Sequence, residues 1–167
     1  LLVTIFSLVV TITFAVTKTW TGSLNSNFNN GGNWSPAGAP GVGDVALFDG
    51  TSAVNCDINV NVSIQGVSIT VAYLGTISQL AGNTIVIGSG GFSQAGGLFV
   101  GGNSAITINS TGLFALSGGT FTNTSGNFTI SGTRNPSQTL FTHSGGTFNH
   151  NNGTVVISPN QSSGANA

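Results

Sequence analysis

The segment FALSGGTF, residues 114–121, points to the architecture of the whole chain because two closely similar octets occur elsewhere in it. FSQAGGLF at 92–99 and FTHSGGTF at 141–148 align with it without gaps, and the shared pattern is F-x-x-[AS]-G-G-[LT]-F. A second series runs in phase with the octets at offsets of 21, 22 and 27 residues: TIVI at 84–87, AITI at 105–108, NFTI at 127–130 and TVVI at 154–157. Repetition at this period predicts an architecture of stacked, equivalent units.

Each unit consists of apolar-alternating runs of about four residues separated by glycine-rich turns, and no segment has helical periodicity. Such strands are too short to form stable hairpins alone, but a unit near 22 residues matches one coil of a β-solenoid. We therefore predict an all-β fold, a single-stranded parallel β-solenoid (β-helix) of about five coils with an N-terminal aromatic cap. A β-sandwich is the alternative, although a sandwich gives no reason for one octet to recur three times.

Stacked coils place equivalent residues above one another at about 4.8 Å. The glycine pairs 96/97, 118/119 and 145/146 then line one corner, where glycine tolerates a positive φ. The sequence also predicts three inward-facing ladders: Phe92, Phe114 and Phe141; Phe99, Phe121 and Phe148; and Ile87, Ile108, Ile130 and Ile157.

The sequence divides into four segments, and the third of these, the solenoid repeats, contains one expected loop. Residues 1–16 carry no charge, so residues 1–18 are interpreted as an apolar export-signal remnant or, because TITFAVTKTW at 11–20 alternates, as an assembly strand that covers a sheet edge. The GTRNPSQT stretch, residues 132–139, is expected to be a loop inserted into one coil. The remaining segments are an N-terminal cap at 19–49, solenoid repeats at 50–158 and a polar tail or linker at 159–167.

Both tryptophans lie in the segment before the repeats. A solenoid needs its first coil covered, because an exposed edge templates aggregation. Trp20 and Trp34 are therefore expected to fill the cap. The alternative is an exposed aromatic platform for a sugar ring.

The opening motifs carry a family resemblance. W-T-G at 20–22, N-W-S-P at 33–36 and P-G-x-G-D at 40–44, followed by the SGGTF units, resemble the start of secreted bacterial surface proteins with adhesin-like or autotransporter-like β-solenoid stalks. The resemblance covers most of residues 19–157. It implies export and a structural or adhesive role, and it supplies no catalytic residues.

Charge limits the chemistry available to the chain. Only 3% of residues are charged, and two basic residues, Lys18 and Arg134, cannot neutralise a run of phosphates, so nucleic acid is not an expected partner. The acidic residues all precede the clear repeats, which argues against paired-carboxylate catalysis on the coils: they are Asp44, Asp49 and Asp57. For Asp44 and Asp49, turn capping is favoured over a shared calcium ion.

Neither the cysteine nor the histidines are expected to form a site. Cys56 is the single cysteine, so it has no intrachain disulfide partner and is interpreted as a buried apolar residue. His143 occupies the place of Gln94 and Leu116, and His150 that of Gly101 and Asn123, so neither position is histidine in the other repeats. No acid or thiol lies near them in the sequence. We therefore predict no catalytic, cofactor-binding or metal-ligating residues.

These observations predict an exported, non-enzymatic structural or adhesive surface module, a rigid β-solenoid stalk that is secreted to the cell surface or the extracellular space. Two alternatives stay open: a subunit of an extracellular filament assembled through the apolar N-terminus, and a carbohydrate-binding appendage. The expected partners are surface glycans or identical subunits. No small-molecule cofactor is expected, and membrane contact is expected only through residues 1–16 if they are retained.

Overall fold

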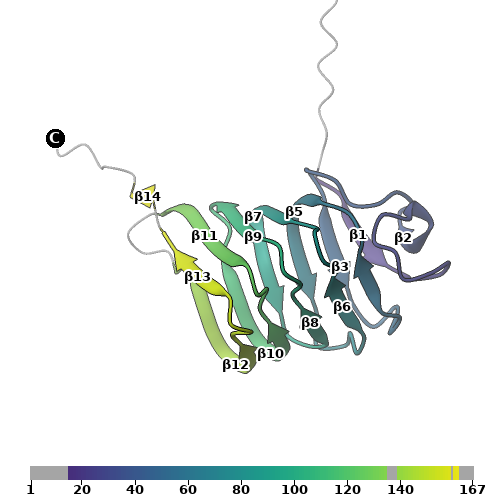
Figure 1. Ribbon diagram of the computed structural model, residues 1–167. Helices are drawn as coiled ribbons and strands as arrows, with labels where there is room; N and C mark the ends of the chain where they lie inside the picture. Colours follow the sequence, from purple (N-terminus) through teal and green to yellow (C-terminus); the bar gives the residue numbers. More distant parts are fainter. Residues whose placement is uncertain (1–14, 135–138, 159, 162–167) are drawn as a thin grey trace, which may run out of the picture.

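The computed structural model describes residues 15–134, 139–158 and 160–161. The chain winds into a parallel β-solenoid of about four turns, close to the five coils expected. Figure 1 shows the coils following one another along the rod, from the cap at the purple end to β12 and β13 at the yellow end. The predicted solenoid is confirmed, and the β-sandwich alternative is wrong.

Three stacks of parallel strands form the sides of the solenoid. Four strands bend at a corner and so contribute to two sides each: β5 (Val62–Ile69), β7 (Ile85–Gln94), β10 (Phe114–Thr122) and β12 (Phe141–Asn149). The two ends of β7 pair with β9 and β10, and the two ends of β10 pair with β7 and β8. β5 and β12 follow the same bend because both of their ends pair with β7 and with β10, respectively. The other strands of the coils are β3 (Val45–Phe48), β4 (Cys56–Ile58), β6 (Thr76–Gln79), β8 (Leu98–Val100), β9 (Ile106–Ser110), β11 (Asn127–Arg134) and β13 (Thr154–Ile157).

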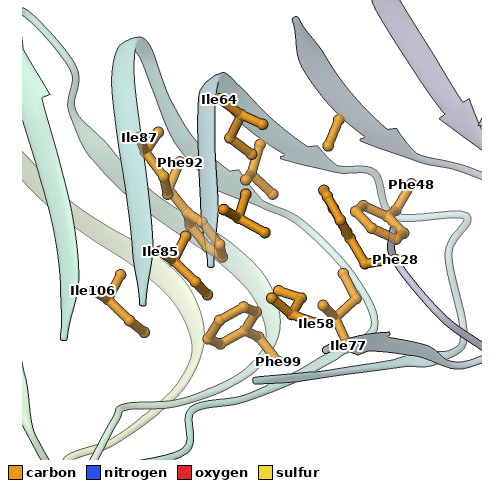
Figure 2. Close-up of a pocket in the computed structure, with 13 residues that line it drawn as sticks. Phe28, Phe48, Ile58, Ile64, Ile77, Ile85, Ile87, Phe92, Phe99 and Ile106 are labelled. Carbon is orange, nitrogen blue, oxygen red and sulfur yellow. The ribbon is translucent and has the colours of Figure 1, made fainter. Parts of the chain in front are cut away.

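The aliphatic ladder on one side has the predicted register. Ile87 pairs with Ile108, Ile108 with Ile130, and Ile130 with Ile157. Figure 2 shows Ile64 of β5 and Ile87 of β7 pointing the same way from neighbouring strands. Because identical side chains repeat at the strand spacing, Ile108 and Ile130 are each packed between two copies of themselves.

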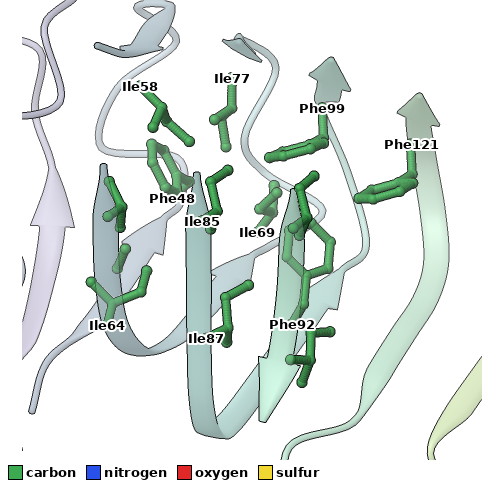
Figure 3. Close-up of a cluster of buried hydrophobic side chains, with 14 of the residues drawn as sticks. Phe48, Ile58, Ile64, Ile69, Ile77, Ile85, Ile87, Phe92, Phe99 and Phe121 are labelled. Atoms are coloured by element: carbon green, nitrogen blue, oxygen red, sulfur yellow. The ribbon is translucent and has the colours of Figure 1, made fainter. Parts of the chain in front are cut away.

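The two phenylalanine ladders are also confirmed. Phe114 pairs with Phe92 and Phe141, and their rings stack at centroid distances of 5.4 and 5.0 Å. In the second ladder, Phe121 stacks on Phe99 at 4.9 Å and on Phe148 at 5.5 Å; Figure 3 shows the Phe99 and Phe121 rings side by side. Both interior rings, Phe114 and Phe121, are 0% exposed. Aromatic contacts of this kind add to the hydrophobic gain from burial.

The glycine pairs form the expected corner. The second glycine of each pair has a positive φ, 59° at Gly97, 71° at Gly119 and 78° at Gly146. A Cβ atom on Gly119 would also collide with the carbonyl oxygen of Gly96 in the preceding coil. Both the backbone conformation and the stacking distance therefore require glycine there.

The N-terminal segment covers the first coil. β1 (Thr17–Trp20) pairs in parallel with β3 and antiparallel with β2 (Trp34–Ser35). Asn27 forms a parallel bridge to Asp57 on another side of the solenoid. These pairings satisfy strand edges that would otherwise be exposed, so the expected cap is confirmed. β3, which the sequence places at the end of the cap, is also the first strand of a stacked side.

The two tryptophans fill the cap. Trp20 is 0% exposed and Trp34 3%, and their rings meet edge-to-face at 5.0 Å. Each indole N–H is satisfied, since Trp20 Nε1 donates to the Val54 carbonyl oxygen at 2.9 Å and Trp34 Nε1 to that of Phe28 at 2.8 Å. The rings are therefore core residues, as the capping interpretation expects.

Asn33 organises the cap loop around the short 3₁₀ helix η1 (Gly31–Asn33). Its side chain is 0% exposed and makes four hydrogen bonds. Oδ1 accepts from the backbone N–H groups of Leu24 and Asn25 at 2.9 and 3.1 Å, and Nδ2 donates to Asn25 Oδ1 and the Asn27 carbonyl oxygen at 2.8 and 2.9 Å. A buried amide with full hydrogen bonding fixes the loop in one conformation.

Other predicted segments lie partly outside the described residues. Residues 1–14 of the apolar segment are not among them, nor are residues 135–138 of the expected insertion loop. In the expected tail, β14 (Asn160–Gln161) pairs with β11, while residues 159 and 162–167 lie outside the description. No helix within the described part of the chain is long and apolar enough to cross a membrane.

Candidate functional site

The cavity inside the solenoid is too small and too apolar to be a ligand site. Its volume is about 10 Å³, and all its lining residues are apolar (Figure 2). It lies where the ladder of Phe92 continues as Val67 and then Ala46, so smaller side chains leave a gap between the coils. A hole of this size without polar partners is expected to stay dry. The interior is therefore a packed core.

His143 has a structural role at the glycine corner. It pairs with Leu116 of the preceding coil, and its Nε2 lies 3.3 Å from the Gly146 carbonyl oxygen, to which it donates. Gln94 occupies the equivalent position two coils earlier and donates from Nε2 to the carbonyl oxygen of Gly97, also three residues ahead, at 3.3 Å. The two side chains close the same corner in different coils. The octet alignment predicts this shared position, but it does not predict the shared hydrogen bond, because the residue between them in the stack is Leu116.

His150 follows β12, and both histidines are exposed because they belong to the C-terminal coil. Among the described residues, no three His, Cys, Asp or Glu side chains gather into a group that could hold a metal ion. The described structure thus brings no cluster of acids or thiols to either histidine.

Asp44 and Asp49 lie at opposite ends of β3 and do not share a site. Asp44 accepts from the backbone N–H of Gly41 through Oδ2 at 3.0 Å and from that of Val16 through Oδ1 at 3.3 Å. Asp49 Oδ1 accepts from the backbone N–H of Thr51 at 2.9 Å. Hydrogen bonds from the Thr51 side chain and backbone hold the pKa of Asp49 below its ordinary value. Both carboxylates thus stabilise turns, and a calcium ion shared between them is ruled out by their separation.

Asp57 joins the cap to the first coil. Its Oδ2 accepts a hydrogen bond from Ser26 Oγ, and its backbone carbonyl oxygen accepts from the Phe28 N–H at 2.9 Å. The carboxylate therefore contributes to cap docking.

Cys56 and Tyr73 are buried next to the cap, and both are 0% exposed. Burial raises the pKa of the Cys56 thiol, with a smaller contribution from the charge of Asp57. Burial also raises the pKa of the Tyr73 phenol, whose hydroxyl donates to the Val54 carbonyl oxygen at 2.8 Å. A buried neutral thiol of this kind is a poor nucleophile.

Several polar side chains are buried on inward positions, which the repeat pattern does not reveal. Gln79 is fully bonded: Nε2 donates to the carbonyl oxygens of Asn83 and Ser104, and Oε1 accepts from the Gly102 N–H. Asn123 lies two coils further along the rod, in the same stacked column of equivalent positions as Gln79. It is 0% exposed, yet neither of its side-chain polar atoms has a hydrogen-bond partner. In the sequence, Gln79 and Asn123 share only a spacing of two coils, and Gly101 lies between them, so the repeat does not mark this position as polar and buried.

The tryptophan and tyrosine side chains, which all lie among the described residues, form no exposed sugar platform. The chain has two tryptophans and one tyrosine, and Trp20, Trp34 and Tyr73 are all buried. Stacking on a sugar ring requires an accessible aromatic face. The alternative of such a platform on Trp20 or Trp34 is therefore wrong.

In comparisons with known proteins, no protein-family model, no curated protein and no solved structure gives a significant match to this chain.

Proposed function

We propose that this chain is a rigid, non-enzymatic structural module of an exported surface protein. The observation that carries the proposal is the unbroken register of the interior ladders, with Phe92, Phe114 and Phe141 stacked ring on ring. Each coil is held to its neighbours by the same apolar contacts and by parallel backbone hydrogen bonds. Stiffness along the axis then follows from repetition.

The exterior of the coils supports a passive or adhesive role. Residues 58–133 contain no Asp, Glu, Lys or Arg. Outward hydroxyl and amide groups link neighbouring coils, as in the bonds from Asn149 Nδ2 to Thr122 Oγ1 and from Ser131 Oγ to Asn109 Oδ1, both at 3.3 Å. A neutral surface of this kind makes many weak hydrogen bonds to a glycan or another neutral surface and exerts no long-range electrostatic steering.

Force spectroscopy on the 167-residue chain tests the mechanical part of the proposal. Pulling should release the solenoid in discrete steps, each near the contour length of one coil, which is about 75 Å for ~22 residues at ~3.4 Å per residue. Phe121→Ala should lower the force of the step that contains it, whereas the outward substitution Thr129→Ala should not. Gradual extension without steps would contradict a rigid module.

Antibody labelling tests export. An antibody raised against the coils should label intact cells of the source organism or its extracellular material without permeabilisation. Signal that appears only after the cells are permeabilised would refute the exported role, whatever the mechanical result.

A further inference from the structure

The C-terminal coil, residues 141–157, ends the described solenoid with an open face. Phe141, Phe148 and Val155 are only partly buried and Ile157 is 48% exposed. Their counterparts in the preceding coil, Phe114, Phe121, Phe128 and Ile130, are at most 1% exposed. Among the described residues, no strand pairs with the free edges of β12 and β13, at the yellow end of Figure 1. All the inward ladders thus stop with one apolar side uncovered.

Within the part of the chain that the structure describes, this open face carries none of the usual protection against strand pairing. Natural edge strands are commonly blocked by charges, proline or a covering element. Residues 139–158 include no Asp, Glu, Lys, Arg or Pro. The opposite end of the rod is different, because β1 pairs with the edge of β3 there and β2 pairs with β1. The C-terminal face is therefore suited to receive another strand layer.

The sequence of β12 is self-complementary in the placement of its aromatic residues. FTHSGGTF begins and ends with phenylalanine, so rotation about its centre, between Ser144 and Gly145, exchanges Phe141 with Phe148. Both phenylalanines belong to inward ladders. An antiparallel copy of β12 would therefore place a phenylalanine over each phenylalanine, with Gly145 opposite Ser144 and Gly146 opposite His143.

We propose that two copies of this chain associate end to end through their C-terminal coils, related by a twofold axis perpendicular to the rod. Phe141 of one copy packs on Phe148 of the other, and the free backbone groups of β12 pair in antiparallel register. The junction is isologous and closed, so it produces a dimer of twice the rod length and no filament.

The other free edge is compatible with the same axis. In β13, antiparallel self-pairing centred on Val156 places Val155 over Ile157 of the second copy, which are both inward positions. One whole coil is the spacing in sequence between Phe92 and Phe114. By this measure, Val156 lies about half a coil after the centre of β12. Since a twofold axis in the plane of a coil crosses it at two points half a coil apart, one axis satisfies both strands.

The neutral composition of the face removes charge repulsion between the copies. This inference rests on the coil geometry and is independent of the proposed exported role, because a chain that stays monomeric could still be a rigid exported module.

Solution mass and shape test the association. Sedimentation velocity and small-angle scattering on the 167-residue chain should give a dimer with about twice the monomer's maximum dimension. Ile157→Lys should raise the dimer dissociation constant at least about ten-fold, because it buries a charge in the junction. The matched control Thr129→Lys, on an outward position of β11, should leave it unchanged. A wild-type monomer, or equal effects of the two substitutions, would overturn the proposal.

Cross-linking tests the register without weakening the interface. Val156→Cys places a thiol on the twofold axis, where antiparallel Cα atoms at about 4.5–5.5 Å fit a disulfide. Mild oxidation should give a covalent dimer, whereas Thr129→Cys, one coil earlier in the same outward column, should not. The native Cys56 is buried and gives no background. Absence of the Val156→Cys dimer, or equal cross-linking of both variants, would refute this register.

Discussion

Truncation of Phe121 is expected to destabilise the chain about twice as much as truncation of Phe148, although the two residues occupy one ladder. Phe121 is 0% exposed and has stacked partners on both sides, Phe99 at 4.9 Å and Phe148 at 5.5 Å. Phe148 has a stacked partner on one side and is partly exposed. Phe121→Ala should therefore cost about 4 kcal/mol, within the usual range for a buried phenylalanine, and Phe148→Ala about 2 kcal/mol.

Urea unfolding measures both values. At a slope of about 2 kcal/mol/M, the midpoint should fall by roughly 2 M for Phe121→Ala and roughly 1 M for Phe148→Ala. Far-UV circular dichroism follows the coils and tryptophan fluorescence follows the cap, so coincident transitions show that the rod unfolds as one unit. The comparison is made in the Ile157→Lys background, where Phe148 stays uncovered by a second copy. Equal shifts, or a larger shift for Phe148→Ala, would refute the nearest-neighbour account of stability.

Three further substitutions or conditions test the corner, the cap and the buried ionisable groups. Gly119→Ala should cost at least about 3 kcal/mol because strain adds to a steric collision, whereas Gly82→Ala, with a φ of 86° but no atom within 4 Å of the new Cβ, should cost about 1 kcal/mol; similar melting temperatures for the two variants would contradict this. Asn33→Ala removes four hydrogen bonds and leaves buried groups unpaired, so the urea midpoint should fall by the equivalent of about 3 kcal/mol; an unchanged midpoint would show that the cap does not depend on it. Burial raises the pKa of Cys56 above 9.0 and that of Tyr73 above 10.0, so the unfolded chain loses these protons first. Their contribution to the free energy of unfolding is therefore complete below about pH 9 and falls at higher pH by up to ~1.4 kcal/mol per pH unit for each group. Urea titrations from about pH 8 to about pH 11 should show this fall, and Cys56→Ala with Tyr73→Phe should remove it; a flat profile for the native chain would contradict it.

The interior ladders were predictable because stacking imposes the same environment on every equivalent position. Phe92, Phe114 and Phe141 recur at one place in the octet, and a side chain that fits between its own copies suits every coil. The glycine corner was predictable for the same reason, since Gly119 has both a required backbone conformation and a close neighbour in the preceding coil.

The buried polar residues were not predictable from the repeat. Gln94 and Asn123 have the residue types of outward positions, and their burial depends on where the chain bends. Gln94 is stabilised by corner carbonyl oxygens that come from its own coil and from Thr120 of the next. Contacts between coils of this kind have no fixed spacing in the sequence.

The candidate site likewise has features that the sequence predicts and features that only the structure shows. The scarcity of carboxylates follows directly from the sequence, and it is enough to argue against paired-acid chemistry on the coils. The octet alignment places His143 at the position of Gln94. The role of His143 does not follow from that alignment, because the hydrogen bond that both side chains make to the glycine corner depends on the tertiary structure. The burial of Trp20 and Trp34 likewise depends on the docking of the cap against β3.

The period, the parallel stacking and the identity of the ladder residues all follow from the amino-acid sequence, since a solenoid repeats one coil's requirements along the chain. The way in which the ladders end follows only from tertiary contacts. At one end, Trp20 and Asn33 close the rod through contacts specific to a segment that occurs once. At the other, Phe148 and Ile157 have the same residue types as counterparts that are buried, but remain partly uncovered. Whether a ladder residue is buried depends on whether another coil or a cap covers it. The repeat in the sequence does not specify which coil has such a cover.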